Sequence, residues 1–506
     1  MKAVYNDSST AEKEAKRRYH FPENLMMENA AAAMEKAVWD SPAAQNHKNL
    51  KILIACGSGN NGGDGLALAR RLCGNASVLV LLYKEPKTPE AKLQFEMAQA
   101  SGVEFITEPE NLKIFKSDEF DIIADCLFGT GFKGEPDSKA AEVISKLNAF
   151  KAWKIACDIP SALVFRADVT VTMGALKTIL FNDKAKACTG RILTAPLGIT
   201  DKKFEECAEP DAFLIEKQDC LFPFRKNPAT HKGSFGHTAV IAGEKSGAAI
   251  IAAEAALEFG SGLTTLVKTK TSNLEQFKIS PALMLSNQLP NNTTALLLGS
   301  GLGTPSEELL NTIVEFLKNA KTTSCPPGLV LDADMFTYTG LASFLEKLLE
   351  VKNLRIILTP HPKELSSLCR LLEIGEYTTA QAAENRMKIA QKISQKYPPL
   401  TVIMKSANTF ILASKTEQEA EPLSEKQKAS SKSSIFICAD GAQSLSKGGS
   451  GDVLAGLCAS LLAQGYSAKQ AAITATEAHA LAGKSFSNGQ GWDLSPEKLI
   501  HALNTL

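Results

Sequence analysis

The sequence lacks the features that mark nucleic-acid-binding and membrane proteins. Its 55 Lys and Arg residues balance its 55 Asp and Glu residues, and no basic stripe stands out, so nucleic acid is not an expected partner. No uninterrupted apolar run approaches the ~18 residues that a membrane span requires, so we expect no membrane partner. Residues 1–21 are polar and have no apolar core, so we expect no secretory signal there.

The cysteines form no recognisable framework. There are 11, an odd number, and no two of them have the C-x-x-C spacing. This argues against a disulfide scaffold and against a zinc site. Several lie in apolar, strand-like runs: Cys56, Cys126, Cys157 and Cys438. Reduced thiols in the core of a cytoplasmic enzyme explain this pattern best.

Apolar strand-like runs alternate with amphipathic helical stretches through both halves of the 506 residues. This alternation predicts α/β domains with parallel sheets and helices on both faces. Strands are predicted at 50–56, 77–83, 120–126, 154–160, 237–243, 295–301, 328–334, 355–361 and 401–406. Helices are predicted at 23–38, 88–102 and 248–260, among others.

The alternation breaks at residues 200–230, which are polar and rich in Pro and Gly. We therefore predict two domains, residues 1–218 and 219–506. Within the second, residues 413–434 are charged, Ser-rich and almost free of large apolar groups. We predict a mobile loop there, between two strands.

A glycine-rich loop, "GSGNNGGDG", follows the first strand of the first domain. Residues 57–62 fit G-x-G-x-x-G, the spacing of a dinucleotide-binding turn, and a helix beginning near Gly63 would direct free N–H groups at an anion. Asn60, Asn61 and Asp64 are unusual in such a turn. Two amides and a carboxylate favour recognition of a hydroxyl or a cation, although a turn without any ligand is the alternative.

Two further predicted strands end in polar motifs, "DCLFGTGFKGE" and "CDIPSA". Ligand crevices in parallel sheets lie outside the carboxyl ends of the strands, so these loops should converge with the first. Asp125, Asp158 and Ser161 would then face one cavity that also holds Asn61. Taken singly, each carboxylate would be interpreted as a helix cap or a loop hydrogen-bond acceptor.

Together with "LMMENA", these motifs resemble the YjeF N-terminal family, the NAD(P)H-hydrate epimerases, over about residues 20–200. The resemblance implies a Rossmann-like three-layer domain, with Asp158 as the acid/base residue for exchange of the hydroxyl at ring carbon six. It implies K⁺ ligands at Asn61, Asp125 and Ser161. It implies substrate contacts at Asn60, Asn61, Gly62, Gly63, Asp64, Gly129, Thr130, Gly131, Phe132, Lys133, Gly134, Glu135 and Asp158. Ala162 departs from the family, which has glycine there.

The second domain carries a different glycine turn, "SKGGSGDVLAGL" at 446–457. Gly448, Gly449 and Gly451 allow backbone N–H groups to converge at the start of a helix, a geometry that stabilises a transferring phosphoryl group. Asp452 is placed to take a proton from an attacking hydroxyl; a helix cap is its alternative role.

Other predicted strands of this domain also end in polar loops. Lys405 follows one strand in "KSANT", and His361 follows another in "LTPHPKE"; "LLLGSGLG" and "LDAD" mark two more strand ends. Because these ends meet at one edge of a parallel sheet, they describe a phosphoryl-transfer cleft.

In this order the motifs resemble the ribokinase-like fold, and within it the ADP/ATP-dependent NAD(P)H-hydrate dehydratases, over residues 225–485. The resemblance implies substrate contacts at Ser261, Gly301, His361 and Asp452. It implies nucleotide contacts at Lys405, Ser406, Ala407, Asn408, Thr409 and Gly451, with Mg²⁺ accompanying ADP or ATP. Ser261, Ser300 and Ser406 stand where Ala, Pro and Gly are usual.

The combination predicts a bifunctional repair enzyme. Hydroxide is a poor leaving group, so Asp452 would activate the ring hydroxyl of hydrated NAD(P)H to attack the terminal phosphoryl of ADP or ATP. Loss of phosphate then restores NAD(P)H. The dehydratases of the family accept the S form, which the epimerase would supply from the R form, and such proteins commonly form homo-oligomers.

Three alternatives remain open on the sequence. One is a ribokinase-like sugar or vitamin kinase fused to a dinucleotide-binding module. Another is a nicotinamide-dependent oxidoreductase, which leaves the second half without a role. The third is a non-catalytic nucleotide sensor, which does not need Asp452.

Overall fold

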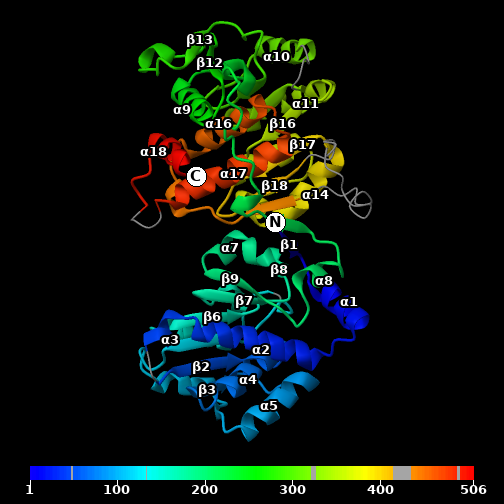
Figure 1. Ribbon diagram of the computed structural model, residues 1–506, viewed down its shortest axis with the longest axis vertical. Helices are drawn as coiled ribbons and strands as arrows, with labels where there is room; N and C mark the ends of the chain where they lie inside the picture. Colours follow the sequence, from blue (N-terminus) through cyan, green and yellow to red (C-terminus); the bar gives the residue numbers. More distant parts are fainter. Residues whose placement is uncertain (47–48, 133, 321–325, 414–434, 487–490) are drawn as a thin grey trace. The chain divides into compact units, whose positions relative to one another are not determined.

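The computed structural model describes residues 1–46, 49–132, 134–320, 326–413, 435–486 and 491–506 (Figure 1). The chain folds into two compact units, Lys2–Asp211 and Ala212–Leu506 together with Met1. Lys133 and residues 414–434 of the predicted loop lie outside the described residues.

The first unit is built on a seven-stranded parallel sheet in the order β4-β3-β2-β5-β6-β7-β9. A short parallel pair joins β1 to β8. The strands are β1 (Lys2–Tyr5), β2 (Lys51–Cys56), β3 (Ser77–Leu82), β4 (Glu104–Ile106), β5 (Ile122–Cys126), β6 (Trp153–Cys157), β7 (Val169–Met173), β8 (Leu176–Lys177) and β9 (Arg191–Ala195).

Helices cover both faces of this sheet because its strands are apolar on both sides. Ile52 and Ile54 of β2 pack in the core that includes α2 and α4, whereas Leu53 and Ala55 pack in the core that includes α6. The helices are α1 (Ser9–Tyr19), α2 (Glu23–Trp39), α3 (Pro42–Asn46), α4 (Asn60–Leu72), α5 (Pro89–Ala100), α6 (Ser138–Ala149), α7 (Asp183–Lys186) and α8 (Asp201–Glu205). The predicted three-layer α/β architecture is confirmed.

The strands of the second unit lie in the order β13-β12-β11-β14-β15-β16-β17-β18-β19-β10. They are β10 (Ala212–Leu214), β11 (His237–Ala242), β12 (Leu263–Lys268), β13 (Met284–Ser286), β14 (Ala295–Leu298), β15 (Gly328–Leu331), β16 (Arg355–Leu358), β17 (Leu400–Met404), β18 (Thr409–Leu412) and β19 (Ile435–Cys438). All neighbours are parallel except at β18, which runs antiparallel to β17 and β19. The sheet is therefore mixed, because the short turn between β17 and β18 leaves no room for a crossover.

This sheet too is buried on both faces. Val240, Leu297 and Val330 pack in one core with α9, α16, α17 and α18, while Leu296 and Leu329, which point the other way, are equally buried. The helices are α9 (Ser246–Glu258), α10 (Glu307–Asn319), α11 (Leu341–Leu349), α12 (Pro362–Leu371), α13 (Thr379–Glu384), α14 (Arg386–Lys396), α16 (Ser450–Ala463), α17 (Ala468–Lys484) and α18 (Pro496–Ala502). None of the helices in the described ranges is long and apolar enough to cross a bilayer.

Candidate active sites

Asp125 and Ser161 meet at the carboxyl ends of β5 and β6. The buried carboxylate of Asp125 accepts hydrogen bonds from the Ser161 amide at 2.8 Å, the Ser161 hydroxyl at 2.7 Å and the Leu127 amide at 3.2 Å. Burial raises the pKa of Asp125 to about 6, although these donors pull it down. The Ser161 hydroxyl in turn accepts from the Phe128 amide at 3.0 Å.

Asn61 lies in the first turn of α4, which begins directly after the glycine loop. Both polar atoms of its side chain are buried, and neither has a hydrogen-bond partner among the described residues. A Cβ on Gly129 would lie 3.4 Å from the Asn61 side chain and 3.3 Å from Asp158 Oδ2. Because a buried amide without a partner is costly, this geometry indicates a missing polar ligand.

Asp158, directly after β6, has a left-handed backbone conformation, and the hydrogen-bond partners of its side chain among the described residues all contact one of its two carboxylate oxygens. Its φ is +66°, a left-handed conformation that few residues other than glycine adopt. Oδ1 accepts from the Met173 amide at 3.1 Å and the Thr172 hydroxyl at 3.3 Å, and forms an ion pair with Lys177 at 2.8 Å. Lys177 was not predicted from the sequence; its signal is a lysine within an otherwise apolar strand.

Asp64 is a second carboxyl group near Asp158. It is buried near the start of α4 and accepts a weak hydrogen bond from the Cys157 thiol at 3.8 Å. Burial, reinforced by the negative charge of Asp158, raises the pKa of Asp64 well above its ordinary value.

The rest of the predicted first site is more open. Phe132 stacks on Phe128 with ring centroids 4.5 Å apart, and Lys133 is not among the described residues. The exposed members are Asn60, Thr130, Gly131, Gly134 and Glu135; Gly62 and Gly63 are buried in α4. At the carboxyl edge of the sheet, Ser161 bonds to Asp125, Gly129 lies against Asn61 and Asp158, and Asp64 interacts electrostatically with Asp158.

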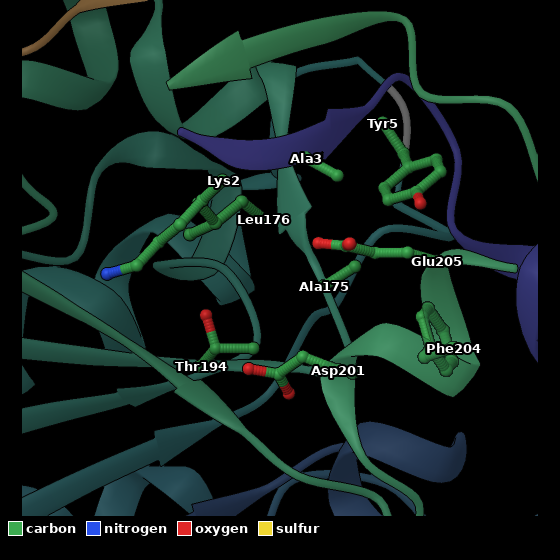
Figure 2. Close-up of a pocket in the computed structure, with 10 residues that line it drawn as sticks. Lys2, Ala3, Tyr5, Ala175, Leu176, Thr194, Asp201, Phe204 and Glu205 are labelled. Atoms are coloured by element: carbon green, nitrogen blue, oxygen red, sulfur yellow. The ribbon is translucent and has the colours of Figure 1, made fainter. Parts of the chain in front are cut away.

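A separate cavity of about 40 Å³ lies beside β1 and β8 (Figure 2). Its lining includes Tyr5, Leu176, Asp201 and Phe204. One water molecule occupies roughly 30 Å³ of liquid, so this space is too small for a nicotinamide ring. None of the predicted site residues lines it.

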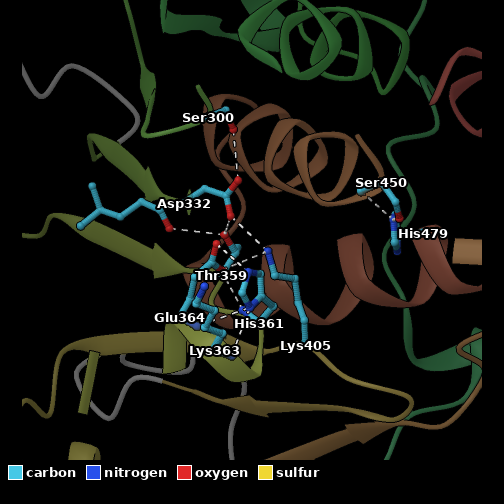
Figure 3. Close-up of polar contacts among 10 residues, drawn as sticks. Ser300, Asp332, Thr359, His361, Lys363, Glu364, Lys405, Ser450 and His479 are labelled. Atoms are coloured by element: carbon cyan, nitrogen blue, oxygen red, sulfur yellow. Dashed lines mark hydrogen bonds and ion pairs between the residues drawn. The ribbon is translucent and has the colours of Figure 1, made fainter. Parts of the chain in front are cut away.

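The second site is organised around a lysine between carboxylates (Figure 3). Lys405 Nζ lies 3.2 Å from Asp332 Oδ1 and 3.9 Å from Glu364 Oε2. Asp332 is 2% exposed, and its Oδ1 also accepts from the Thr359 hydroxyl at 2.5 Å. Burial lowers the pKa of Lys405, but Asp332 and Glu364 outweigh it and the pKa is raised. Lys405 is thus a fixed cation.

Asp452 occupies the first turn of α16, whose preceding residue Gly449 has φ +89°. A Cβ on Gly451 would lie 3.4 Å from Lys405 Nζ, so the lysine approaches this helix start closely. Burial and the charge of Asp332 raise the pKa of Asp452 to about 7, while a hydrogen bond from Ser300 and the charge of Lys405 oppose the shift. A carboxylate with this pKa is a competent general base near neutrality.

The start of α16 has a further contact that was not predicted from the sequence. His479 Nε2, on α17, lies 2.9 Å from the Ser450 carbonyl oxygen and 3.0 Å from the Ser450 hydroxyl (Figure 3). Burial lowers the pKa of His479 to about 4, so the ring is neutral. Since a carbonyl only accepts, Nε2 carries the proton and donates to it.

The loop after β14 reaches the same region. Gly301 has φ +64°, and a Cβ there would lie 2.2 Å from the Lys245 carbonyl oxygen, so only glycine fits. The Ser300 hydroxyl donates to Asp332 Oδ2 at 3.1 Å. His361 follows β16 with an exposed ring, and its Nδ1 caps α12 by accepting from the Glu364 amide at 3.3 Å.

Residues 405–409 form the turn from β17 into β18. The Lys405 amide donates to the Pro360 carbonyl at 2.9 Å, and the Asn408 carbonyl accepts from Arg386 at 2.6 Å. Asn408 is buried, Ala407 is exposed, and Ser406 and Thr409 are half-buried. Of this loop, Lys405 directs its side chain to the start of α16.

The structure does not bring Ser261 to this group. Ser261 precedes β12 and is buried, with its hydroxyl bonded to Thr238 at 2.7 Å and to Ser460 at 3.0 Å. Thr238 lies near the start of β11, so Ser261 sits at the amino ends of the parallel strands, opposite Asp332 and Lys405. We therefore assign no substrate contact to Ser261.

Comparisons with known proteins cover the whole chain. A family model described as NAD(P)H-hydrate dehydratase matches residues 238–505, and one described as YjeF-related protein N-terminus matches residues 23–179. The chain is 36% identical to the bifunctional NAD(P)H-hydrate repair enzyme Nnr of Helicobacter pylori, with 100% of each chain covered. The chain belongs to the family of bifunctional NAD(P)H-hydrate repair enzymes.

The chain is also similar to two further proteins. The Nnr protein of Coxiella burnetii is 30% identical over 90% of this chain and 89% of its own. Among solved structures, the ADP/ATP-dependent NAD(P)H-hydrate dehydratase of Bacillus subtilis, co-crystallized with ATP/Mg²⁺, is 20% identical with a TM-score of 0.44, covering 57% of this chain and 94% of its own. The family membership predicted from the motifs is confirmed.

Proposed function

We propose that this repair enzyme interconverts the R and S forms of hydrated NADH and NADPH and dehydrates the S form. ADP, giving AMP and phosphate, or ATP drives the second step. The full-length match to the family carries the proposal, and each unit has a carboxylate site suited to one step. We assign the epimerase to residues 1–218 and the dehydratase to residues 219–506.

In the epimerase, Asp158 takes the proton of the hydroxyl on ring carbon six and passes it to the ring nitrogen as the bond between that carbon and the nitrogen opens to an aldehyde. Closure of the same bond on the other face of the aldehyde reverses the proton transfer and inverts the carbon. Asp158 Oδ2 faces Gly129 and Asn61, where the substrate would lie, and burial raises the pKa of the neighbouring Asp64 well above its ordinary value. The loops 60–64 and 129–135 would hold the rest of the dinucleotide.

The residues present fit a K⁺ ion in this unit. Asn61 has a buried amide oxygen without a partner among the described residues, and the carboxylate of Asp125 and the hydroxyl of Ser161 meet at the ends of the neighbouring strands β5 and β6. Oxygen ligands of this kind suit a hard cation. Asn61, Asp125 and Ser161 would hold the ion, which when bound supplies positive charge to the negative groups of substrate and protein.

In the dehydratase, Asp452 accepts the proton of the ring hydroxyl as the hydroxyl oxygen attacks the terminal phosphoryl group. Lys405 and the N–H groups at the start of α16 neutralise the charge that develops. The phosphorylated hydroxyl leaves as phosphate, and loss of a ring proton restores the double bond. Gly301 and His361 would contact the hydrated substrate, and residues 405–409 with Gly451 the nucleotide, with Mg²⁺ entering alongside it.

Two further predictions concern the setting of the enzyme. The ten described cysteines are all free, which supports a cytoplasmic location. Assembly into a homo-oligomer stays a prediction.

Recovery of reduced-nicotinamide absorbance from a mixed R/S preparation of hydrated NADH tests the proposal. With ADP or ATP, the wild type should recover all of the absorbance, Asp158→Asn only the S fraction, and Asp452→Asn less than about one-hundredth of the rate. The rate of spontaneous epimerisation, measured without protein, is the control. Full recovery by Asp158→Asn above that rate removes Asp158 from the epimerase, and no recovery by the wild type returns the second unit to the kinase alternative.

A further inference from the structure

Lys177 is a buried lysine whose ammonium group is fully occupied. The residue is 1% exposed, and its Nζ lies 2.8 Å from Asp158 Oδ1. It also donates to the Thr172 hydroxyl at 3.1 Å and to the carbonyls of Met173 at 2.8 Å and Ala175 at 3.2 Å. With four acceptors around three N–H bonds, Lys177 has no capacity left for a substrate group.

The two carboxylate oxygens of Asp158 have different surroundings. Oδ1 receives Lys177, the Met173 amide and the Thr172 hydroxyl. Oδ2 points the other way, 3.3 Å from where a Cβ on Gly129 would lie, and no described residue donates to it. One oxygen is therefore anchored in the protein, and the other faces the glycine loop.

We propose that Lys177 is the positioning residue of the epimerase: by anchoring Oδ1 it fixes the Asp158 side chain and directs Oδ2 at the substrate hydroxyl. The inference rests on the proposed role of Asp158. A buried carboxylate needs a cation and hydrogen-bond donors in place of the water it has lost. The left-handed backbone of Asp158 also needs fixed partners to persist.

The charged surroundings of Asp158 leave no substitute for this lysine. Asp64 of α4 and the Cys157 thiol of β6 also interact with Asp158, and neither becomes a cation. Without Lys177, Oδ1 would keep only the Met173 amide and the Thr172 hydroxyl as partners among the described residues, and Oδ2 would lose its fixed direction.

The test uses the full chain with R-hydrated NADH and no nucleotide, so that only epimerisation proceeds. Chromatographic separation of R and S forms gives kcat and KM. We expect Lys177→Met to lose about tenfold or more in kcat with KM changed by less than about twofold, because the base is no longer held in position. Lys177→Arg keeps a cation beside Asp158 and should restore part of kcat.

Lys151→Met, which removes an exposed lysine of the same unit, is the matched control and should behave as wild type. Far-UV circular dichroism and the nucleotide-dependent dehydration of S-hydrated NADH report whether each variant is folded. If Lys177→Met does not fold, Thr172→Val, which removes the hydroxyl between Lys177 and Asp158, should lower kcat with KM changed by less than about twofold.

The outcomes distinguish the proposed role of Lys177 from the proposed role of Asp158, on which it rests. A folded Lys177→Met, or in its place Thr172→Val, with wild-type kcat overturns the role of Lys177 while Asp158→Asn remains inactive. Wild-type epimerisation by Asp158→Asn instead overturns the proposed function of Asp158 itself.

Discussion

Removing the hydroxyl of Ser300 should shift the pH dependence of the dehydratase. Burial and the charge of Asp332 raise the pKa of Asp452 to about 7, and a hydrogen bond from Ser300 opposes that rise. Because the donor stabilises the charged carboxylate, Ser300→Ala should raise the pKa of Asp452 further. As a general base Asp452 works deprotonated, so the acidic limb of the activity profile should move to higher pH.

The size of the shift follows from the sharing of one proton. A hydrogen bond to a charged group contributes about 1.5–3 kcal/mol, and one pKa unit corresponds to about 1.4 kcal/mol, so a full bond is worth about 1–2 units. The Ser300 hydroxyl also donates to Asp332 Oδ2 at 3.1 Å. Since one proton cannot serve both carboxylates at once, we expect about 0.5–1 unit.

The assay is kcat/KM for S-hydrated NADH at saturating nucleotide, followed by absorbance from pH 5.5 to 9, which reports the free-enzyme pKa. At the acidic end Ser300→Ala should lose about 3–10-fold, and at pH 9 almost nothing. Ser300→Thr keeps the hydroxyl and should keep the profile, whereas Ser300→Pro, the usual family residue, should shift it. An unmoved limb in Ser300→Ala, with Asp452→Asn inactive, would refute the reasoning.

Three shorter predictions concern stability and binding. Ala162 has φ +55°, so Ala162→Gly should stabilise the first unit by about 1 kcal/mol and raise its Tm by about 2–4 °C in calorimetry; an unchanged Tm counts against strain there. The folded state holds the Asp125 proton up to about pH 6 instead of 3.8, so stability falls as pH rises through that window, by at most about 3 kcal/mol. K⁺ should therefore raise Tm more at pH 8 than at pH 5. Na⁺ should raise Tm less than K⁺ does, and neither ion should raise the Tm of Asp125→Asn. Gly451→Ala places a methyl group 3.4 Å from Lys405 Nζ and should raise the nucleotide KM while epimerisation continues unchanged.

The convergence of the first site could be predicted from the sequence because it follows from topology. Asp125 lies at the end of the run that forms β5, Asp158 and Ser161 follow the run that forms β6, and Asn61 follows the short turn after β2; these three strands are adjacent and parallel. Parallel neighbours end at the same edge of a sheet, so the residues that follow them must lie close together. No knowledge of side-chain packing is needed for that step.

The partners that tune these residues could not be predicted in the same way. Lys177 lies in a two-residue strand with no motif, and its pairing with Asp158 depends on how β8 returns past the end of β7. His479 reaches Ser450 only because α17 packs against α16. Such contacts depend on tertiary packing, which local sequence patterns do not predict.

For Ser261, the motif resemblance implied a substrate contact, but it did not take account of whether the residue lies before or after its strand. The run that follows it forms β12, so Ser261 lies before a strand, whereas Asp332, His361 and Lys405 each lie after one. Its hydroxyl is taken up by Thr238 and Ser460. Strand direction, read from the sequence alone, would have separated it from the others.

Each site pairs a lysine with an aspartate at the end of a parallel strand, but the pairing differs between the two sites. Lys177 contacts the proposed acid–base residue Asp158 itself. Lys405 contacts Asp332 instead, while burial and the charge of Asp332 raise the pKa of Asp452 to about 7, which suits removal of a proton from a weakly acidic hydroxyl. Lys405 also lies at the start of α16, where the helix dipole is positive, an arrangement that is favourable only when an anion such as a phosphoryl group binds between them.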